Sequence, residues 1–98
     1  MSEIDYGEVR KRSIEVGRVK TSISIEDAFW NQLRRIASRR GIGLFKLISD
    51  IDFDREKVGN LSSAIRQFVL HDALERIDDV ETRAAVVLPT QAARAVSA

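Results

Sequence analysis

The feature that most constrains this chain is a strand pattern that leads directly into a helix pattern. Residues 20–25 alternate polar and apolar side chains, which is the two-residue period of a half-buried strand. From Glu26 onward the apolar residues recur at helical spacing, and no loop residues separate the two segments. A lone strand cannot pair its own backbone groups. A second strand must therefore lie beside this one.

Two partners are open for that strand. Residues 13–16 also alternate, and Gly17-Arg18 offers a tight turn after them, because glycine accepts a positive φ without steric cost. Residues 19–25 can therefore form a hairpin with 13–16, or they can pair with the same strand of a second chain. In both arrangements the strand has one polar and one apolar face, formed by Lys20, Ser22 and Ser24 and by Thr21, Ile23 and Ile25 respectively.

Three helices are predicted after the strand. Acidic residues in the first turn, basic residues in the last turn and a glycine at position 41 delimit the first of them. The predicted ranges are 26–40, about 44–51, and from Asn60 or Ser62 to about Ile77, with Asn60 as an N-cap and residues 52–59 as a loop. Their apolar stripes are Phe29, Leu33, Ile36 and Ala37; Leu44, Leu47, Ile48 and Ile51; and Leu61, Ala64, Ile65, Phe68, Val69 and Ala73.

Length and composition predict one small globular domain with flexible ends. The chain has 98 residues, of which 44% are hydrophobic and 32% charged. We expect a flexible leader at 1–9, a domain at 10–77 and a C-terminal tail at 78–98. A core of this size is modest, so oligomerisation is a plausible source of further burial. The N-terminus lacks the features of a signal peptide and no apolar run is long enough to span a membrane, which predicts a cytoplasmic protein without membrane contact.

The sequence argues against an enzyme. It contains no cysteine, which excludes disulfides, thiolate zinc sites and cysteine nucleophiles, and it contains a single histidine, His71. The alternating carboxylates from Asp50 to Glu56 lack the glycine and the final glutamate that a calcium loop needs. We therefore predict no catalytic residue, no metal site and no cofactor.

The charge distribution suggests an anionic partner for the N-terminal half. Residues 1–48 carry ten Lys or Arg against six Asp or Glu, a net charge of +4, whereas residues 49–98 carry six against nine, a net charge of −3. The basic residues beside the strands are Arg10, Lys11, Arg12, Arg18 and Lys20. Such an asymmetry favours a partner such as nucleic acid, although a solvated basic surface is the simpler interpretation.

The polar strand face has the chemistry for DNA. A two-stranded antiparallel ribbon fits the major groove, where lysine and serine can bond to base edges. Lys20, Ser22 and Ser24 are therefore candidate base contacts, and ordinary exposed strand residues are the alternative. Free N–H groups at the start of the second helix, near Gly43 and Lys46, could hold a phosphate. Arg10, Lys11, Arg12 and Arg18 are further candidates for phosphate contacts.

The order of elements resembles the ribbon-helix-helix family, which includes the Arc and MetJ repressors. Three blocks carry a closer likeness to short bacterial ribbon-helix-helix proteins: residues 11–14, 21–30 and 60–66. The resemblance covers about residues 10–76. The chain departs from the simplest members by an extra upstream strand, by an interrupted second helix followed by a third, and by Gly43 where the second helix usually has a Ser or Thr cap.

The resemblance implies a mainly α fold with an N-terminal β-ribbon, assembled as an intertwined homodimer in which each chain supplies one strand. It implies that Lys20, Ser22 and Ser24 enter the major groove. It also implies that Gly43, Leu44 and Lys46 contact phosphate, largely through the backbone. The residues expected in the dimer core are Thr21, Ile23, Ile25, Phe29, Trp30, Leu33, Ile36, Leu47 and Ile48.

The leading functional hypothesis is a dimeric, sequence-specific protein that binds double-stranded DNA and regulates transcription, associated with the nucleoid when bound. One alternative is the antitoxin of a toxin–antitoxin pair, in which residues 78–98 bind a toxin or another protein. Another is a protein-interaction module that has lost DNA binding.

Overall fold

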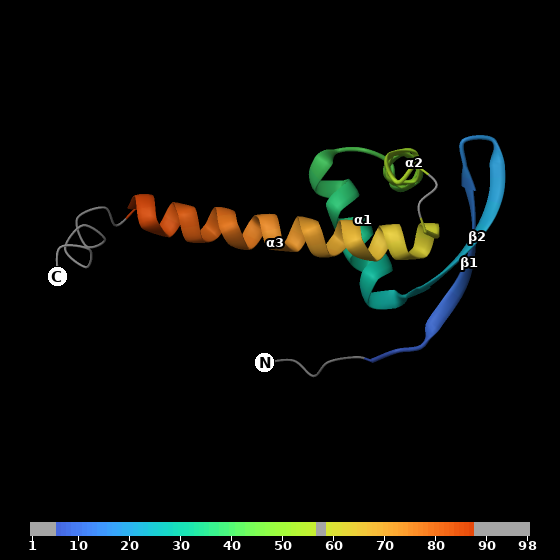
Figure 1. The fold of residues 1–98 in the computed structure, drawn as a ribbon, viewed down its shortest axis with the longest axis horizontal. Helices are drawn as coiled ribbons and strands as arrows, with labels where there is room; N and C mark the ends of the chain where they lie inside the picture. Colours follow the sequence, from blue (N-terminus) through green and yellow to red (C-terminus); the bar gives the residue numbers. More distant parts are fainter. Residues whose placement is uncertain (1–5, 57–58, 88–98) are drawn as a thin grey trace.

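The computed structural model describes residues 6–56 and 59–87. Two strands are followed by three helices: β1 (Val9–Val16), β2 (Val19–Glu26), α1 (Asp27–Arg40), α2 (Leu44–Asp54) and α3 (Leu61–Val87). The strands form a hairpin at one end of the molecule, and α1, α2 and the first half of α3 gather beside it (Figure 1). The second half of α3 extends away from this cluster (Figure 1). The observed class is therefore the expected one, a β-ribbon followed by three helices.

β2 finds its partner within the same chain. β1 and β2 pair antiparallel, with Val16 opposite Val19 and Val9 opposite Glu26. Gly17 has φ 64° and Arg18 a negative φ, which is the two-residue turn whose twist suits a hairpin. Of the two expected partners, the structure therefore shows the hairpin. β1 begins at Val9 instead of Ser13, which places its first residue inside the leader expected at 1–9. The rest of that leader, residues 1–5, lies outside the described residues.

The helix ends follow the predicted capping chemistry. Gly41 closes α1 in the left-handed region at φ 66°, and its N–H donates to Ser38. Asn60 caps α3, because its Oδ1 accepts the N–H of Ser63 at 2.7 Å. The turn and the two caps therefore match local sequence signals.

Two helices are longer than predicted. α2 continues to Asp54 instead of ending at Ile51, and α3 continues to Val87 instead of ending near Ile77. The apolar period fades in both extensions. The extension of α3 contains Glu, Arg and Ala, which are good helix formers that need no core contact to remain helical. Part of the predicted tail is therefore helix, and residues 88–98 lie outside the described residues.

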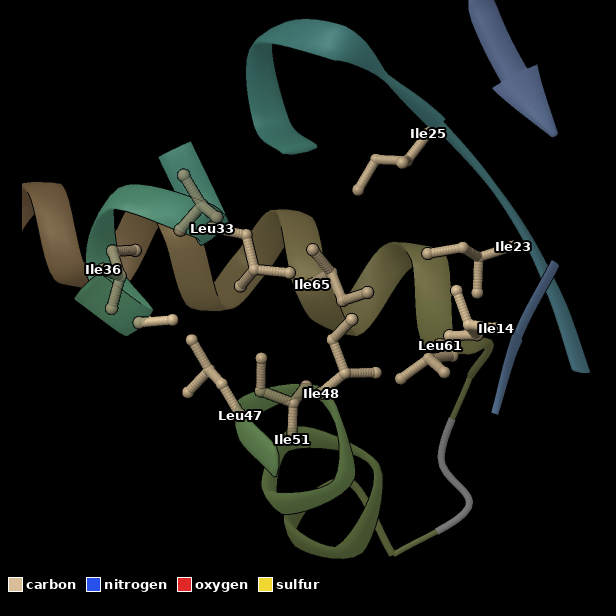
Figure 2. Packing of buried hydrophobic residues seen from close by; sticks show 12 residues of the cluster. Ile14, Ile23, Ile25, Leu33, Ile36, Leu47, Ile48, Ile51, Leu61 and Ile65 are labelled. Carbon is tan, nitrogen blue, oxygen red and sulfur yellow. The ribbon is translucent and has the colours of Figure 1, made fainter. Parts of the chain in front are cut away.

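A single core joins the hairpin to all three helices. The buried side chains point into one shared interior (Figure 2). Six of them are the largest fully buried side chains: Ile25, Leu33, Ile36, Leu47, Ile48 and Ile65. Of the residues expected in a dimer core, Ile23 and Ile25 on β2 and the leucines and isoleucines of α1 and α2 are buried here by one chain, while Thr21, Phe29 and Trp30 are half-buried.

The large apolar side chains of α3 are divided between the core and the solvent. In its first half Leu61, Ile65 and Val69 face the core. From Leu70 onward the large apolar side chains are at least half exposed, and we call Leu70, Leu74, Ile77 and Val80 the outward stripe of α3. Leu74 follows Ile65 by nine residues, about two and a half turns at roughly 3.6 residues per turn, so it lies on the opposite side of the helix. The outward stripe therefore serves no purpose in this chain's own core.

Candidate nucleic-acid interface

One face of the hairpin is polar and turned away from the helices. The register places Lys11 opposite Ser24, Ser13 opposite Ser22, and Glu15 opposite Lys20. Side chains directly opposite each other share a face, and all six are exposed. We call this set the outer face: Lys11, Ser13, Glu15, Lys20, Ser22 and Ser24. It contains the three predicted base contacts and three side chains from β1, of which Ser13 and Glu15 were not among the candidates.

The cations of this region have unoccupied donors. Within residues 6–56 and 59–87, the side chains of Lys11, Arg18 and Lys20 make no ion pair or hydrogen bond. Arg18 is exposed at the hairpin tip. Lysine can donate to guanine or phosphate oxygens, serine can donate or accept, and a carboxylate such as that of Glu15 can accept from cytosine. The outer face therefore has the groups needed to bond to base edges and phosphates.

The basic run at residues 10–12 is divided between the two faces. Arg12 faces inward, where its guanidinium pairs with Asp27 and lies 4.6 Å from the centroid of the Trp30 ring. The Nε of Arg12 is buried and has no hydrogen-bond partner among residues 6–56 and 59–87. Arg10 also approaches Asp27, at 3.3 Å. Of the three side chains proposed as a phosphate clamp, only Lys11 lies on the outer face, while Arg12 ties β1 to α1.

The outer edge of β2 is held by α3. The N–H of Ser24 donates to the Oγ of Ser62 at 3.1 Å, and the carbonyl of Ser24 accepts from Arg66 at 3.3 Å. Arg66 also donates two hydrogen bonds to Glu26, at 2.9 and 2.7 Å. The hydrogen bond from Arg66 lowers the pKa of the Glu26 carboxyl below its ordinary value of 4.5. No local pattern in the sequence predicts this contact, because it joins residues about 40 positions apart.

The start of α2 keeps its backbone donors without a side-chain cap. Gly43 occupies the N-cap position at φ −69° and ψ 149°, and the first helical hydrogen bond runs from Leu47 back to Gly43. The N–H groups of the first turn, including that of Leu44, have no acceptor inside a helix. Lys46 pairs with Asp50 on the same helix at 2.6 Å, so its ammonium is already engaged. Phosphate binding at this helix start remains a prediction, which rests on the backbone N–H groups of the first turn.

Other charged clusters are structural. Asp72 is buried and holds Arg39 at 2.9 Å and Arg76 at 3.1 Å, which joins α1 to α3. His71 lies 2.8 Å from Glu75 on the exposed side of α3. Across the described ranges, 6–56 and 59–87, no cluster of His, Asp or Glu is arranged to hold a metal ion. No helix in that part of the chain is long and apolar enough to cross a membrane.

Comparison with known proteins gives one match. The family model described as the ribbon-helix-helix domain matches residues 9–73, from the first residue of β1 into α3. Searches of the curated proteins and of the solved structures find no match to this chain. The matched range covers more than half of the 98 residues and contains the hairpin, α1 and α2. This chain therefore belongs to the ribbon-helix-helix domain family, a family with a DNA-binding fold.

Proposed function

We propose that this protein is a homodimeric transcription regulator that binds a specific double-stranded DNA sequence with the outer face of its hairpin. The observation that carries the proposal is the outer face itself, where Lys11 and Lys20 present donors that no group in the described part of the chain occupies. A two-stranded ribbon matches the width of the major groove, and a dimer would present two such surfaces to a palindromic site. We place the protein in the cytoplasm, on the nucleoid when bound.

Lys20, Ser22 and Ser24 are proposed to contact base edges, with Lys11 and Arg18 contacting bases or phosphates nearby. The N–H groups at Gly43 and Leu44 are proposed to bind a flanking phosphate. We omit Arg12 from the interface because Asp27 and Trp30 already hold its guanidinium. Arg10 and Lys46 are secondary candidates, because each would have to leave a carboxylate of its own chain.

The test is a triple variant, Lys20→Ala/Ser22→Ala/Ser24→Ala, assayed on the operator selected by the wild type from random or genomic DNA. Each lost base contact costs about 1–3 kcal/mol, so operator affinity should fall roughly 100-fold or more. Circular dichroism should show an unchanged fold. Unchanged operator affinity would refute the assignment.

A matched control removes a cation and a hydroxyl elsewhere on the surface. Arg35 and Ser38 are exposed on α1, and neither side chain makes a hydrogen bond or an ion pair within the described ranges. The Arg35→Ala/Ser38→Ala variant should keep its sequence preference and most of its affinity. A loss equal to that of the triple variant would mean that the measured binding is general electrostatic attraction.

The outward stripe of α3 favours a second candidate function, that of an antitoxin. Its four apolar side chains are between 50% and 65% exposed, which is unusual for a helix without a partner. Co-expression with the product of an adjacent small gene would test it: Leu70→Asp/Leu74→Asp should abolish co-purification, and Glu75→Ala/Asp79→Ala on the polar side should not. If no such gene adjoins this one, the antitoxin candidate fails.

A further inference from the structure

A shallow hollow lies on the exposed side of α3. Ala73, Arg76, Ile77 and Val80 line it, together with Glu81. The first four residues stand at positions i, i+3, i+4 and i+7, which are the neighbours that enclose one depression on a helix surface. In a coiled coil such a depression receives one side chain of the facing helix. The shape of α3 therefore suits a second helix.

The apolar side chains around this hollow repeat with the spacing of a coiled coil. Leu70, Ala73, Ile77 and Val80 are separated by three, four and three residues, which is the a/d repeat of a heptad. We call these four residues the seam of α3. Leu70, Ile77 and Val80 are between 52% and 65% exposed, so no element within the described ranges buries them. A facing helix would remove this apolar surface from water.

The seam begins at Leu70, because the same side of α3 is already in use before it. Arg66 stands seven residues before Ala73, and its guanidinium donates to Glu26 and to the carbonyl of Ser24. The seam, residues 70–80, is therefore shorter than two heptads. A free coiled coil takes about three or four heptads. The seam can thus act only between chains that other contacts already join.

Charge selects a second copy of this chain as the partner, and it selects a parallel orientation. Arg76 borders the seam on one side, and Glu81 borders it on the other. In a parallel pair these unlike sides meet, so Arg76 faces the partner's Glu81, twice by symmetry. In an antiparallel pair each side meets its own copy, which brings Arg76 toward the partner's Arg83. Within the described ranges only the Nε of Arg76 is engaged, by Asp72 at 3.1 Å, so its remaining donors can reach the partner's carboxylate.

We propose that the two chains of the homodimer pack α3 against α3, parallel and in register along the seam, so that the partner's Ile77 fills the hollow. This proposal deepens the proposed function and rests on it for the contacts that first join the chains. The hairpin lies at the start of α3 (Figure 1), so parallel helices carry both hairpins at one end of the coil. Both outer faces can then meet one duplex, whereas antiparallel helices would hold them at opposite ends.

Cysteine cross-linking tests the seam directly, because the chain has no native cysteine. Ala73→Cys and Val80→Cys, made separately, place a thiol where identical residues of a parallel pair meet within disulfide reach. Both should give a disulfide-linked dimer under mild oxidation, with unchanged circular dichroism. An antiparallel pair cannot link both, because their seven-residue separation leaves at least one thiol pair about 10 Å apart or more along the axis. Thr82 is exposed about 200° around the helix from Val80, so Thr82→Cys should remain unlinked.

A charge reversal tests the orientation. Glu81→Arg places an arginine opposite the partner's Arg76 twice, so it should raise the dimer dissociation constant about tenfold at low salt and less at high salt. Asp79→Arg makes the same change of charge about 200° around the helix from Ile77, away from the seam. This matched control should leave the dissociation constant within about threefold of the wild type. Analytical ultracentrifugation measures both variants.

The outcomes separate this proposal from the proposed function. A link at only one seam position, a link through Thr82→Cys, or equal effects of the two arginine variants would overturn the parallel seam. A dimer that links at neither seam position would overturn the seam and leave the homodimer standing, whereas a protein that stays monomeric at all concentrations would overturn both. An unlinked dimer whose co-purification with an adjacent gene product is abolished by Leu70→Asp/Leu74→Asp would assign the outward stripe to the antitoxin candidate instead.

Discussion

The two faces of the hairpin are built from the same strands and share residue types, yet they have opposite roles. On the inner face, Arg12 is fixed by Asp27 and Trp30, and Ile25 is fully buried. On the outer face, Lys11 is exposed and its side chain makes no ion pair or hydrogen bond within the described ranges. The comparison teaches that a basic run on a strand is not one surface. Alternation divides it into charges that hold the fold and charges that are available to a ligand.

The largest test of this division is Ile25→Ala on the inner face. Ile25 is 0% exposed, so the substitution leaves a cavity between β2 and the helices and should cost about 3 kcal/mol of unfolding free energy. Urea denaturation followed by the fluorescence of the single tryptophan, Trp30, measures it. The neighbouring outer-face change Ser24→Ala should stay within about 0.5 kcal/mol. Equal losses in the two variants would break the distinction between the faces.

Smaller changes in stability are expected from substitution of two neighbouring cations on β1, Arg12 and Lys11. Arg12→Ala removes an ion pair and a cation–π contact that are both partly exposed, so it should cost about 1 kcal/mol and alter the emission of Trp30. Lys11→Ala should leave stability within about 0.5 kcal/mol and weaken DNA binding. Urea titration and DNA binding of both variants provide the comparison. Loss of stability in Lys11→Ala, or a loss in Arg12→Ala that is mainly of DNA affinity, would contradict the roles assigned to these two residues.

The smallest effect concerns Glu26, whose carboxyl bonds to Arg66 on α3. Its pKa is lowered in the folded state, so its contribution to stability is present above the unfolded-state pKa and is lost as pH falls through the folded-state pKa. The urea midpoints of wild type and Glu26→Gln should therefore differ at neutral pH and converge below about pH 4.5. Arg66→Gln removes the largest cause of the lowering, so an NMR titration should show the pKa of Glu26 raised toward its ordinary value. Parallel midpoints down to pH 3 would show that Glu26 contributes no linked stability.

Local signals predicted much of the fold. The alternation at residues 19–25, the turn at Gly17 and the caps at Gly41 and Asn60 are all present, because each depends on residues close together in sequence. The pattern did not predict residues 78–87 of α3, because residues 78–83 are all exposed and supply no buried stripe of helical period. Residues that are helical by propensity alone, without a core contact, need not repeat apolar side chains at helical spacing.

The candidate site was only half predictable. The exposure of Lys20, Ser22 and Ser24 follows from alternation. Ser13 and Glu15 could have been found too, because a two-residue turn at Gly17-Arg18 fixes which residues lie opposite each other. The inward position of Arg12 and the hold of Arg66 on β2 could not, because both depend on the packing of helices that lie far along the chain.

The position of the outward stripe on α3 has a consequence for control of the protein. The axial distance from Leu61, beside the hairpin, to Ile77 in the outward stripe is roughly 24 Å at 1.5 Å per residue. A molecule docked on the stripe and a duplex on the hairpin would therefore not compete for the same space. Any influence of one on the other would have to pass along α3 as a shift between two conformations of the folded protein. A ligand that binds both conformations equally would leave the affinity for DNA unaltered.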